Sequence, residues 1–369
     1  MWALAQDTLS NSDIDALADW LRTHPRLTQG SEVRRFEAEW SRWMGCRDSV
    51  FVSSGTTANF ALVARAAARV SRAQPRIGVA AVTWSTNLAP SLLMGHQVRV
   101  FDIDPRTLGI DAQAVCASMR AGELDILFVT HLLGLNALTH EIVATAADCG
   151  VILLEDCCES HGARHGAAPE GGRVGTIGLG STFSFYFGHH MSTIEGGMVC
   201  TNDESFGDDI RLMRAHGLAR ESRHFDRYAA EYREIDRRFL FLQPGLNFRS
   251  TDLNAWLGQR QLLELDARID QRNQNMNAFL ESAPSTLFRD FNTEGMSSFA
   301  LPLIARSRAE RIAIQECCDR LGLESRPVIA GNLLRQPMLR GYDVLAPPGG
   351  TSVADHIHDC GLYVGNGHH

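Results

Sequence analysis

The sequence contains no lysine, and all 35 of its basic side chains are arginines. A codon bias toward arginine accounts for most of these positions. It does not supply a primary amine where a reaction needs one. Any mechanism in which a lysine amine forms a Schiff base is therefore excluded for this chain.

Long hydrophobic runs are also absent. No stretch approaches the roughly 20 apolar residues of a membrane-spanning helix, and the N-terminus lacks the pattern of a signal peptide. The net charge of -8 argues against non-specific nucleic-acid binding, which needs a basic surface. We therefore predict a cytoplasmic protein that acts on small molecules, without a nucleic-acid or membrane partner.

The nine cysteines form no metal-binding or disulfide-rich pattern. After Cys200 the chain offers only Cys317, Cys318 and Cys360, whose spacing does not suit an iron–sulfur cluster. We predict reduced thiols, no iron–sulfur cluster and no bound metal.

The 369 residues, 44% hydrophobic and 21% charged, are typical of a two-domain globular enzyme. We expect an N-terminal segment and large domain over residues 1–270 and a small α/β domain over residues 271–369. No closing helix follows the last apolar run, so we expect a truncated C-terminus or the start of a tag at His368 and His369.

Short apolar runs alternate with helical patterns through the first two-thirds of the chain. This alternation predicts an α/β fold with a mostly parallel sheet covered on both faces. A long helix is predicted over Asp252–Ile269, and Phe299–Ile304 is expected to begin the small domain. The predicted strands are Ser49–Ser53, Ile77–Val82, Val98–Ile103, Ile126–Thr130, Val151–Glu155, Thr182–Tyr186 and Gly197–Thr201.

Two segments at strand ends carry candidate binding groups. The small-residue loop Ser53–Asn59 lies between a strand and a helix, where free backbone N–H groups suit a phosphate, although it is equally typical of a tight turn. Asp156 ends an apolar strand, where open α/β sheets bind ligands. It suits a metal, a catalytic base, a protonated ring nitrogen or, alternatively, a helix N-cap.

Two adjacent histidines, His189 and His190, follow another predicted strand and precede Gly196-Gly197. Neighbouring residues of an extended chain point to opposite sides, so the pair is poorly placed for one metal ion. We expect one ring to face a pocket and the other to pack.

Four strings in this order resemble one family: SSGTTA, LLEDCCESHGA, FSFYFGHH with EGG, and GLNFRSTDLNAWLGQRQL. The sequence is similar to the DegT/DnrJ/EryC1/StrS family of sugar aminotransferases and dehydratases, from about Leu27 to Asn366. The resemblance implies the fold type I of pyridoxal-phosphate-dependent transferases, like aspartate aminotransferase, with a large domain and a smaller C-terminal one.

The resemblance also implies cofactor-binding residues. Gly55 and Thr56 would meet the cofactor phosphate, with a hydroxyl from Ser184. Trp84 would stack on the pyridine face, although core packing is its alternative. Asp156 would keep the ring nitrogen protonated, which makes the ring an electron sink.

Two further roles follow from the same resemblance. Glu159 stands where the family often has glutamine, near the ring hydroxyl. Asn247 would reach the cofactor phosphate of the neighbouring subunit, which implies a homodimer with shared active sites.

The chain departs from the aminotransferases at His189, which stands where they carry the Schiff-base lysine. This replacement resembles the 3-dehydratases that remove the C3 hydroxyl of nucleotide-linked 4-keto-6-deoxy sugars, with GDP-4-keto-6-deoxymannose of the colitose pathway the favoured substrate. It implies non-covalent pyridoxamine 5'-phosphate or pyridoxal 5'-phosphate, regenerated by glutamate. Imidazole, with an unperturbed pKa of about 6.5, suits a catalytic base and acid.

Substrate contacts are expected from two arginine-containing stretches. His216 and Arg220 lie in a turn that resembles the family's R-x-H-G motif, and Arg326 and Asn332 lie beside glycine and proline. Arginine forks suit carboxylates and diphosphates, although arginines of an ordinary surface are the alternative.

Other functions remain open at the level of sequence. The same fold would serve another nucleotide-linked ketosugar, a lysine-less protein similar to the aminotransferases, or a non-catalytic cofactor-binding homologue. A metal site at His189 and His190 is a further alternative.

Overall fold

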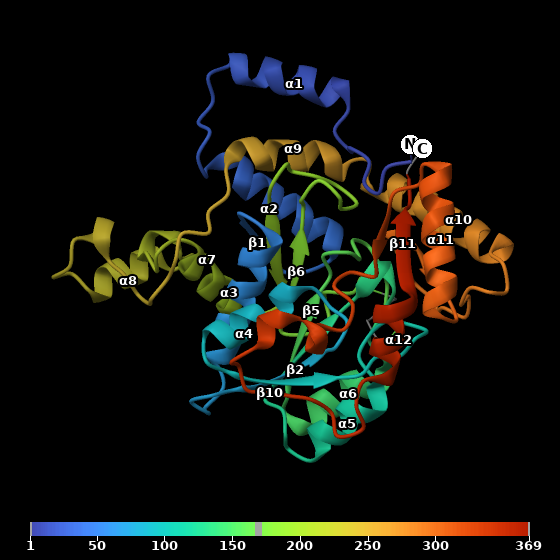
Figure 1. Cartoon of the computed structure of the whole chain (residues 1–369). Helices are drawn as coiled ribbons and strands as arrows, with labels where there is room; N and C mark the ends of the chain where they lie inside the picture. The colour runs from blue at the N-terminus through green and yellow to red at the C-terminus, as the bar shows by residue number, and fades with distance from the viewer. Residues whose placement is uncertain (1, 167–171, 368–369) are drawn as a thin grey trace.

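The computed structural model describes residues 2–166 and 172–367 and contains two sheets (Figure 1). The eight-stranded sheet has the order β1-β7-β6-β5-β4-β2-β3-β10, in which β7 alone runs antiparallel to its neighbours. The mostly parallel sheet predicted from the sequence is therefore confirmed. Its strands are β1 (Asp48–Val52), β2 (Arg76–Ala80), β3 (Gln97–Phe101), β4 (Ile126–Thr130), β5 (Ile152–Asp156), β6 (Gly180–Ser184), β7 (Gly197–Thr201) and β10 (Val344–Leu345).

The central strands are buried from end to end, which explains their continuous apolar sequences. β4 and β7 have the predicted bounds, whereas β6 begins two residues before the predicted Thr182. The helices are α1 (Asn11–Arg22), α2 (Ser31–Met44), α3 (Gly55–Ala67), α4 (Ala89–Leu93), α5 (Ala112–Arg120), α6 (His140–Cys149), α7 (Glu204–Arg214), α8 (Phe225–Glu231), α9 (Asp252–Leu262), α10 (Leu265–Ser282), α11 (Arg308–Leu321) and α12 (Ser352–Cys360).

The helix predicted over Asp252–Ile269 is not one helix. It breaks after α9, and α10 continues well beyond the predicted end. Leu263 at the break is 87% exposed, whereas Leu265 and Ile269 pack into the cluster around Trp40. The change of direction lets α10 bury its own apolar side chains. The sequence gives no sign of this break, because no glycine or proline lies at it.

The second sheet is antiparallel and has the order β8-β11-β9, built from β8 (Ala300–Ile304), β11 (Gly361–Gly365) and β9 (Ser325–Pro327). Its neighbourhood includes α10, α11 and α12. The chain crosses between the two sheets more than once, because β10 pairs with β3 while Trp2 forms a bridge with Leu323. A domain boundary at residue 270 stays a prediction.

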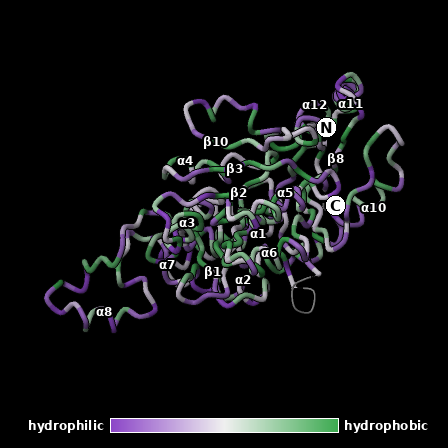
Figure 2. Tube along the Cα trace, turned by 90° about the horizontal axis from the view of Figure 1, so that it is seen from below, coloured by the Kyte–Doolittle hydropathy of each residue, from purple (hydrophilic) through white to green (hydrophobic). Residues whose placement is uncertain are grey.

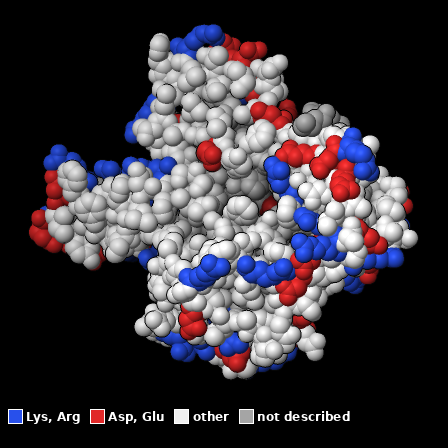
Figure 3. Space-filling view, viewed as in Figure 1, with Lys and Arg blue, Asp and Glu red and all other residues white. Residues whose placement is uncertain are grey.

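An arm around α8 stands clear of the body in both views (Figure 1, Figure 2). Charges of both signs gather at its tip in Figure 3. Within the arm, Arg237 pairs with Asp226. The arm also exposes large apolar side chains, at Phe239, Phe241 and Leu246 among others. Among the described residues, no helix has the length and apolar character needed to cross a membrane.

Candidate active site

A cavity of about 620 Å³ opens at the carboxyl ends of the parallel strands, where α/β sheets place their ligands. Its walls come from the large sheet, the N-terminus of α3, the loop after β6 and the smaller sheet. Eight of the residues predicted from the sequence line it together: Gly55, Thr56, Trp84, Asp156, Glu159, Ser184, His189 and Arg326.

The first turn of α3 forms one end of the cavity. Ser54 caps the helix by accepting a bond from the backbone N–H of Thr57, so the N–H groups of Gly55 and Thr56 have no acceptor within the helix. A Cβ on Gly55 would lie 2.7 Å from the Cβ of Ser184. Only glycine fits there, and the resulting cradle of N–H groups beside a hydroxyl suits a phosphate.

Asp156 is fixed at the end of β5 by three hydrogen bonds. The side-chain amides of Asn59 and Asn87 donate to Oδ2 at 3.0 and 2.7 Å, and the backbone N–H of Cys158 donates to Oδ1 at 2.9 Å. No helix of the described chain begins at Asp156, so it does not act as a helix N-cap. The carboxylate is held rigidly where it lines the cavity.

Sequence reasoning missed the two amides that hold this carboxylate. Asn59 is buried within α3 and accepts a hydrogen bond from Thr182, while Asn87 accepts one from Thr83. One signal was available: Asn59 lies between Ala58 and Ala61 on an otherwise apolar helix face. A buried amide in such a position needs a polar partner.

Trp84 is 54% exposed and lines the cavity, so it does not pack in the core. The same cavity is lined by Gly55 and Thr56 of α3 and by Asp156 at the end of β5. This position is suited to stacking on an aromatic ligand.

Glu159 lines the cavity and accepts a hydrogen bond from the backbone N–H of Leu133 at 2.9 Å. Burial raises the pKa of Glu159 to about 8, and the charge of Asp156 raises it further, against the effect of the Leu133 bond. At neutral pH this carboxyl is mostly protonated, and it presents a hydrogen-bond donor much as glutamine would.

His189 and His190 point to different surroundings. His189 is half-buried and lines the cavity, with its ring 5.7 Å from that of Phe299. His190 is fully buried, and its Nε2 lies 3.1 Å from the carbonyl oxygen and from the hydroxyl of Ser297. The expectation that one ring faces a pocket while the other packs is confirmed.

Burial lowers the pKa of His189 to about 4. The negative charge of Asp156 acts in the opposite direction, and the positive charge of Arg272 reinforces the decrease. His189 is therefore neutral at physiological pH and able to accept a proton.

The wall of the cavity beside the smaller sheet includes two groups that the sequence did not indicate, Glu324 and the N-terminal segment. Arg326 is paired with Glu324 at 2.6 Å, and the backbone N–H of Leu4 donates to the same carboxylate. The N-terminal segment at Leu4 and Ala5 thus forms part of the wall.

Four predicted residues lie outside this cavity. Asn247 and His216 are exposed, and Arg220 lines a separate cavity between α2 and α7. Asn332 is buried, and its amide donates to Thr351 and Asp355. For Asn332 this geometry favours a structural role, and the substrate contacts predicted for Asn332, His216 and Arg220 stay predictions.

One group of described residues is spaced closely enough for a metal ion: His131, Glu155 and Cys157. The carboxylate of Glu155 already accepts backbone bonds from Gly175, Ile177 and Gly178 and lies 3.3 Å from His131. These contacts account for the buried charge without a metal.

The chain matches the model of the DegT/DnrJ/EryC1/StrS aminotransferase family over residues 8–362. GDP-4-keto-6-deoxy-D-mannose 3-dehydratase of Yersinia pseudotuberculosis is 33% identical, over 98% of this chain and 93% of that protein. The Escherichia coli enzyme of that name, solved with bound hydrated PLP, superposes with a TM-score of 0.90 at 28% identity, covering 100% and 96% of the two chains. A GDP-4-keto-6-deoxymannose-3-dehydratase with a trapped PLP-glutamate geminal diamine gives 0.89 at 28% identity, with 100% and 96% covered.

Proposed function

The chain belongs to the DegT/DnrJ/EryC1/StrS aminotransferase family, and on this premise we propose that it is a nucleotide-sugar 3-dehydratase. It removes the C3 hydroxyl of a 4-keto-6-deoxyhexose, with the GDP-linked 4-keto-6-deoxymannose as favoured substrate. The observation that carries this proposal is an imidazole, His189, lining the cofactor cavity of a chain that contains no lysine.

The cavity fits pyridoxamine 5'-phosphate or pyridoxal 5'-phosphate. Gly55, Thr56 and Ser184 form a cradle for the phosphate, Trp84 offers a stacking face, and Asp156 suits the protonated ring nitrogen. When bound, the pyridoxamine form supplies an amine for the C4 ketone and an electron sink that allows the C3–O bond to break. Without a lysine, the cofactor is held by non-covalent contacts alone.

His189 moves the protons of the reaction in this proposal. Its neutral imidazole accepts a proton at a ring nitrogen, and the imidazolium then donates it to the departing C3 oxygen. A pKa of about 4 makes that imidazolium a strong acid, which suits protonation of a poor leaving group. Glu159, mostly protonated at neutral pH, donates a hydrogen bond to the ring hydroxyl.

The working enzyme is proposed to be a cytoplasmic homodimer that uses glutamate to restore the amine form. The apolar side chains of the projecting arm, such as Phe239 and Phe241, support a subunit interface, because exposed apolar patches of this kind mark contact surfaces. Asn247 lies at the base of this arm, outside its own cavity. In the dimer it would reach the partner's cofactor phosphate.

The substrate is tested with a panel of 4-keto-6-deoxyhexoses linked to GDP, CDP and dTDP, each incubated with pyridoxamine 5'-phosphate and glutamate. We expect loss of the C3 hydroxyl, followed by mass spectrometry, and the fastest turnover with the GDP-linked sugar. Transfer of an amino group to the sugar in place of dehydration would identify an aminotransferase and contradict the proposal.

Replacing the imidazole tests the role of His189. In His189→Asn, dehydration should fall by roughly 100-fold or more, because the proton carrier is lost while cofactor binding persists. Cofactor binding by absorbance serves as the control for folding. His189→Lys should trap the aldehyde form covalently, so that borohydride followed by mass analysis finds an adduct that the unaltered protein does not form. Near-normal turnover of His189→Asn would remove His189 from this role.

A further inference from the structure

A buried arginine without a counter-charge lies behind the cavity. Arg272 of α10 is 4% exposed, and no carboxylate pairs with it among the described residues. Its Nη1 donates to the backbone carbonyl of Phe299, whose ring contacts His189 and His190. A buried, unpaired guanidinium is costly to the fold, so its position calls for an explanation.

Three imidazoles gather beside this arginine. The ring of His161 lies 6.0 Å from that of His189, nearly parallel to it, and 5.2 Å from that of His190. Four buried ring nitrogens of this group have no hydrogen-bond partner, namely both nitrogens of His161 and the Nδ1 atoms of His189 and His190. Packing against aromatic neighbours holds these rings, together with the hydrogen bonds of His190 to Ser297.

The charge of Arg272 acts on all three rings. Burial is the largest cause that lowers the pKa of His161, His189 and His190, and the positive charge of Arg272 lowers each of them further. Burial also lowers the pKa of Arg272 itself, to about 10, so it remains charged at neutral pH.

The groups that face His189 from its other neighbours are few. At the end of β5, the carboxylate of Asp156 raises the pKa of His189, and so does a backbone hydrogen bond involving Cys158. The negative charge of Asp156 favours the imidazolium form, against the larger effect of burial. Arg272 lies on α10 and opposes that effect.

We propose that Arg272 is a positioning residue which, together with the packed imidazoles of His161 and His190, destabilises the imidazolium form of His189, so that this ring gives up its proton readily. The guanidinium opposes the effect of Asp156, whose carboxylate stabilises the imidazolium form of His189, so that this carboxylate can serve the cofactor ring without holding a proton on the catalytic imidazole. This inference rests on the proposed function of His189.

A second arginine of the same helix provides a matched control. Arg268 lies one turn before Arg272 and is also buried, but it pairs with Glu264 and donates to Gln261 and to the carbonyl of Thr8. Its charge is already compensated, and the causes that shift the pKa of His189 do not include it.

The test is an NMR titration of the histidine rings in the cofactor-free protein, with assignments from single substitutions of His161, His189 and His190 by glutamine. In Arg272→Met, the pKa values of all three rings should rise, that of His189 by at least about half a unit. The pKa values of the remaining histidines of the chain should not change. Arg272→Lys, which retains a positive charge, should restore the original behaviour. Arg268→Met should leave the three rings unchanged.

Unchanged titration of His189 in Arg272→Met would overturn the inference. If this variant does not fold, as judged by circular dichroism, Arg272→Gln replaces it with a side chain that still reaches the carbonyl of Phe299. A joint shift of the three rings in a protein that performs no dehydration would uphold the electrostatic role of Arg272 and reject the proposed function. Dehydration without a shift in the three pKa values would support the proposed function and reject the electrostatic role of Arg272.

Discussion

Two clusters of buried charged or titratable side chains differ in how completely they are paired. The cavity cluster, formed by His161, His189, His190 and Arg272, has a cation without a carboxylate and ring nitrogens without partners. The edge cluster lies between α2 and α7, and each of its four members pairs with an opposite charge. Its members are Glu37, Asp48, Arg211 and Arg214.

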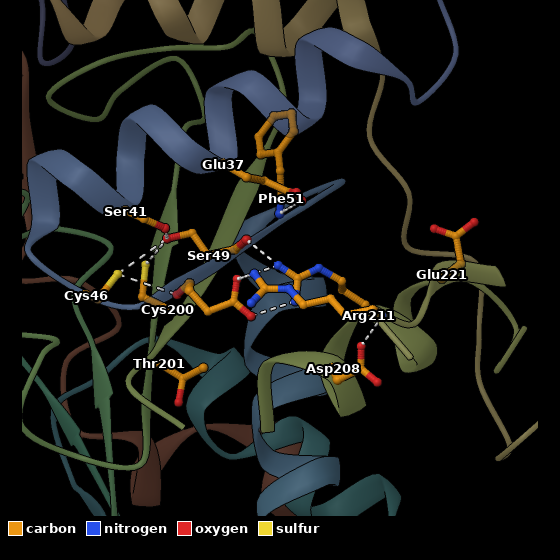
Figure 4. Close-up of polar contacts among 12 residues, drawn as sticks. Glu37, Ser41, Cys46, Ser49, Phe51, Cys200, Thr201, Asp208, Arg211 and Glu221 are labelled. Carbon is orange, nitrogen blue, oxygen red and sulfur yellow. Dashed lines mark hydrogen bonds and ion pairs between the residues drawn. The ribbon is translucent and has the colours of Figure 1, made fainter. Parts of the chain in front are cut away.

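The edge cluster covers the outer side of β1, an edge strand of the large sheet (Figure 4). Arg211 binds both carboxylate oxygens of Asp48. Glu37 accepts the backbone N–H of Phe51, and Arg214 pairs with Glu37 while donating to the carbonyl of Phe51. These side chains occupy backbone groups to which another strand would otherwise bind.

The difference shows two uses of buried charge in one molecule. In the edge cluster, paired ions cover the edge strand β1 and occupy backbone groups that another strand could bind. In the cavity cluster, burial and the charge of Arg272 lower the pKa values of the three histidines, at a cost in stability. Unpaired polar groups of this kind are expected where chemistry takes place.

The largest effect is expected from breaking a pair in the edge cluster. Asp48→Asn leaves the guanidinium of Arg211 buried without its counter-charge and should lower the free energy of unfolding by about 3–5 kcal/mol, measured by urea denaturation. Asp19→Asn, which breaks the exposed pair with Arg22, should cost less than about 0.5 kcal/mol. Similar losses of stability in the two variants would mean that the buried pair contributes no more than the exposed one.

An intermediate effect is expected at the phosphate cradle, which adjoins the cavity cluster. Gly55→Ala places a Cβ 2.7 Å from that of Ser184 and should weaken cofactor binding at least tenfold, or about 1.4 kcal/mol. Titration of the cofactor absorbance measures this. Gly349→Ala has open space around its new Cβ and serves as the control. Unaltered affinity in Gly55→Ala would mean that the phosphate binds elsewhere.

The smallest effect is a pH-dependent gain in stability. Unfolded glutamate ionises from pH about 4.5, whereas the carboxyl of Glu159 stays protonated up to about 8, so the stability it contributes is lost as pH rises between these values. Glu159→Gln should therefore raise the free energy of unfolding by about 1 kcal/mol more at about pH 8.5 than at about pH 5. The exposed Glu281→Gln should show no such difference. An equal gain in the free energy of unfolding at both pH values would mean that burial does not raise the pKa of Glu159.

The sequence predicted the parts of the site that lie directly after strands. Asp156 and His189 follow apolar runs, and parallel strands bring their carboxyl ends to one edge, so their meeting in one cavity follows from the fold class. The absence of lysine could be read without any structure, and it separated this chain from the aminotransferases it resembles.

The groups that tune these residues could not be found in the same way. Arg272 comes from a helix more than 80 positions along the chain from His189, within a segment whose break after Leu262 carries no turn signal. Among 35 basic residues, nothing in the local sequence distinguishes a buried, unpaired arginine from a surface one. The burial of Arg272 is seen only in the structure, where α10 brings its guanidinium to the carbonyl of Phe299.

The short pairing of β10 with β3 has a mechanical consequence. The carboxylate of Asp102, just beyond β3, also accepts the backbone N–H groups of Val353 and Ala354 at the start of α12. Because α12 leads directly into β11, these bonds fasten the smaller sheet to the edge of the larger one at two neighbouring points.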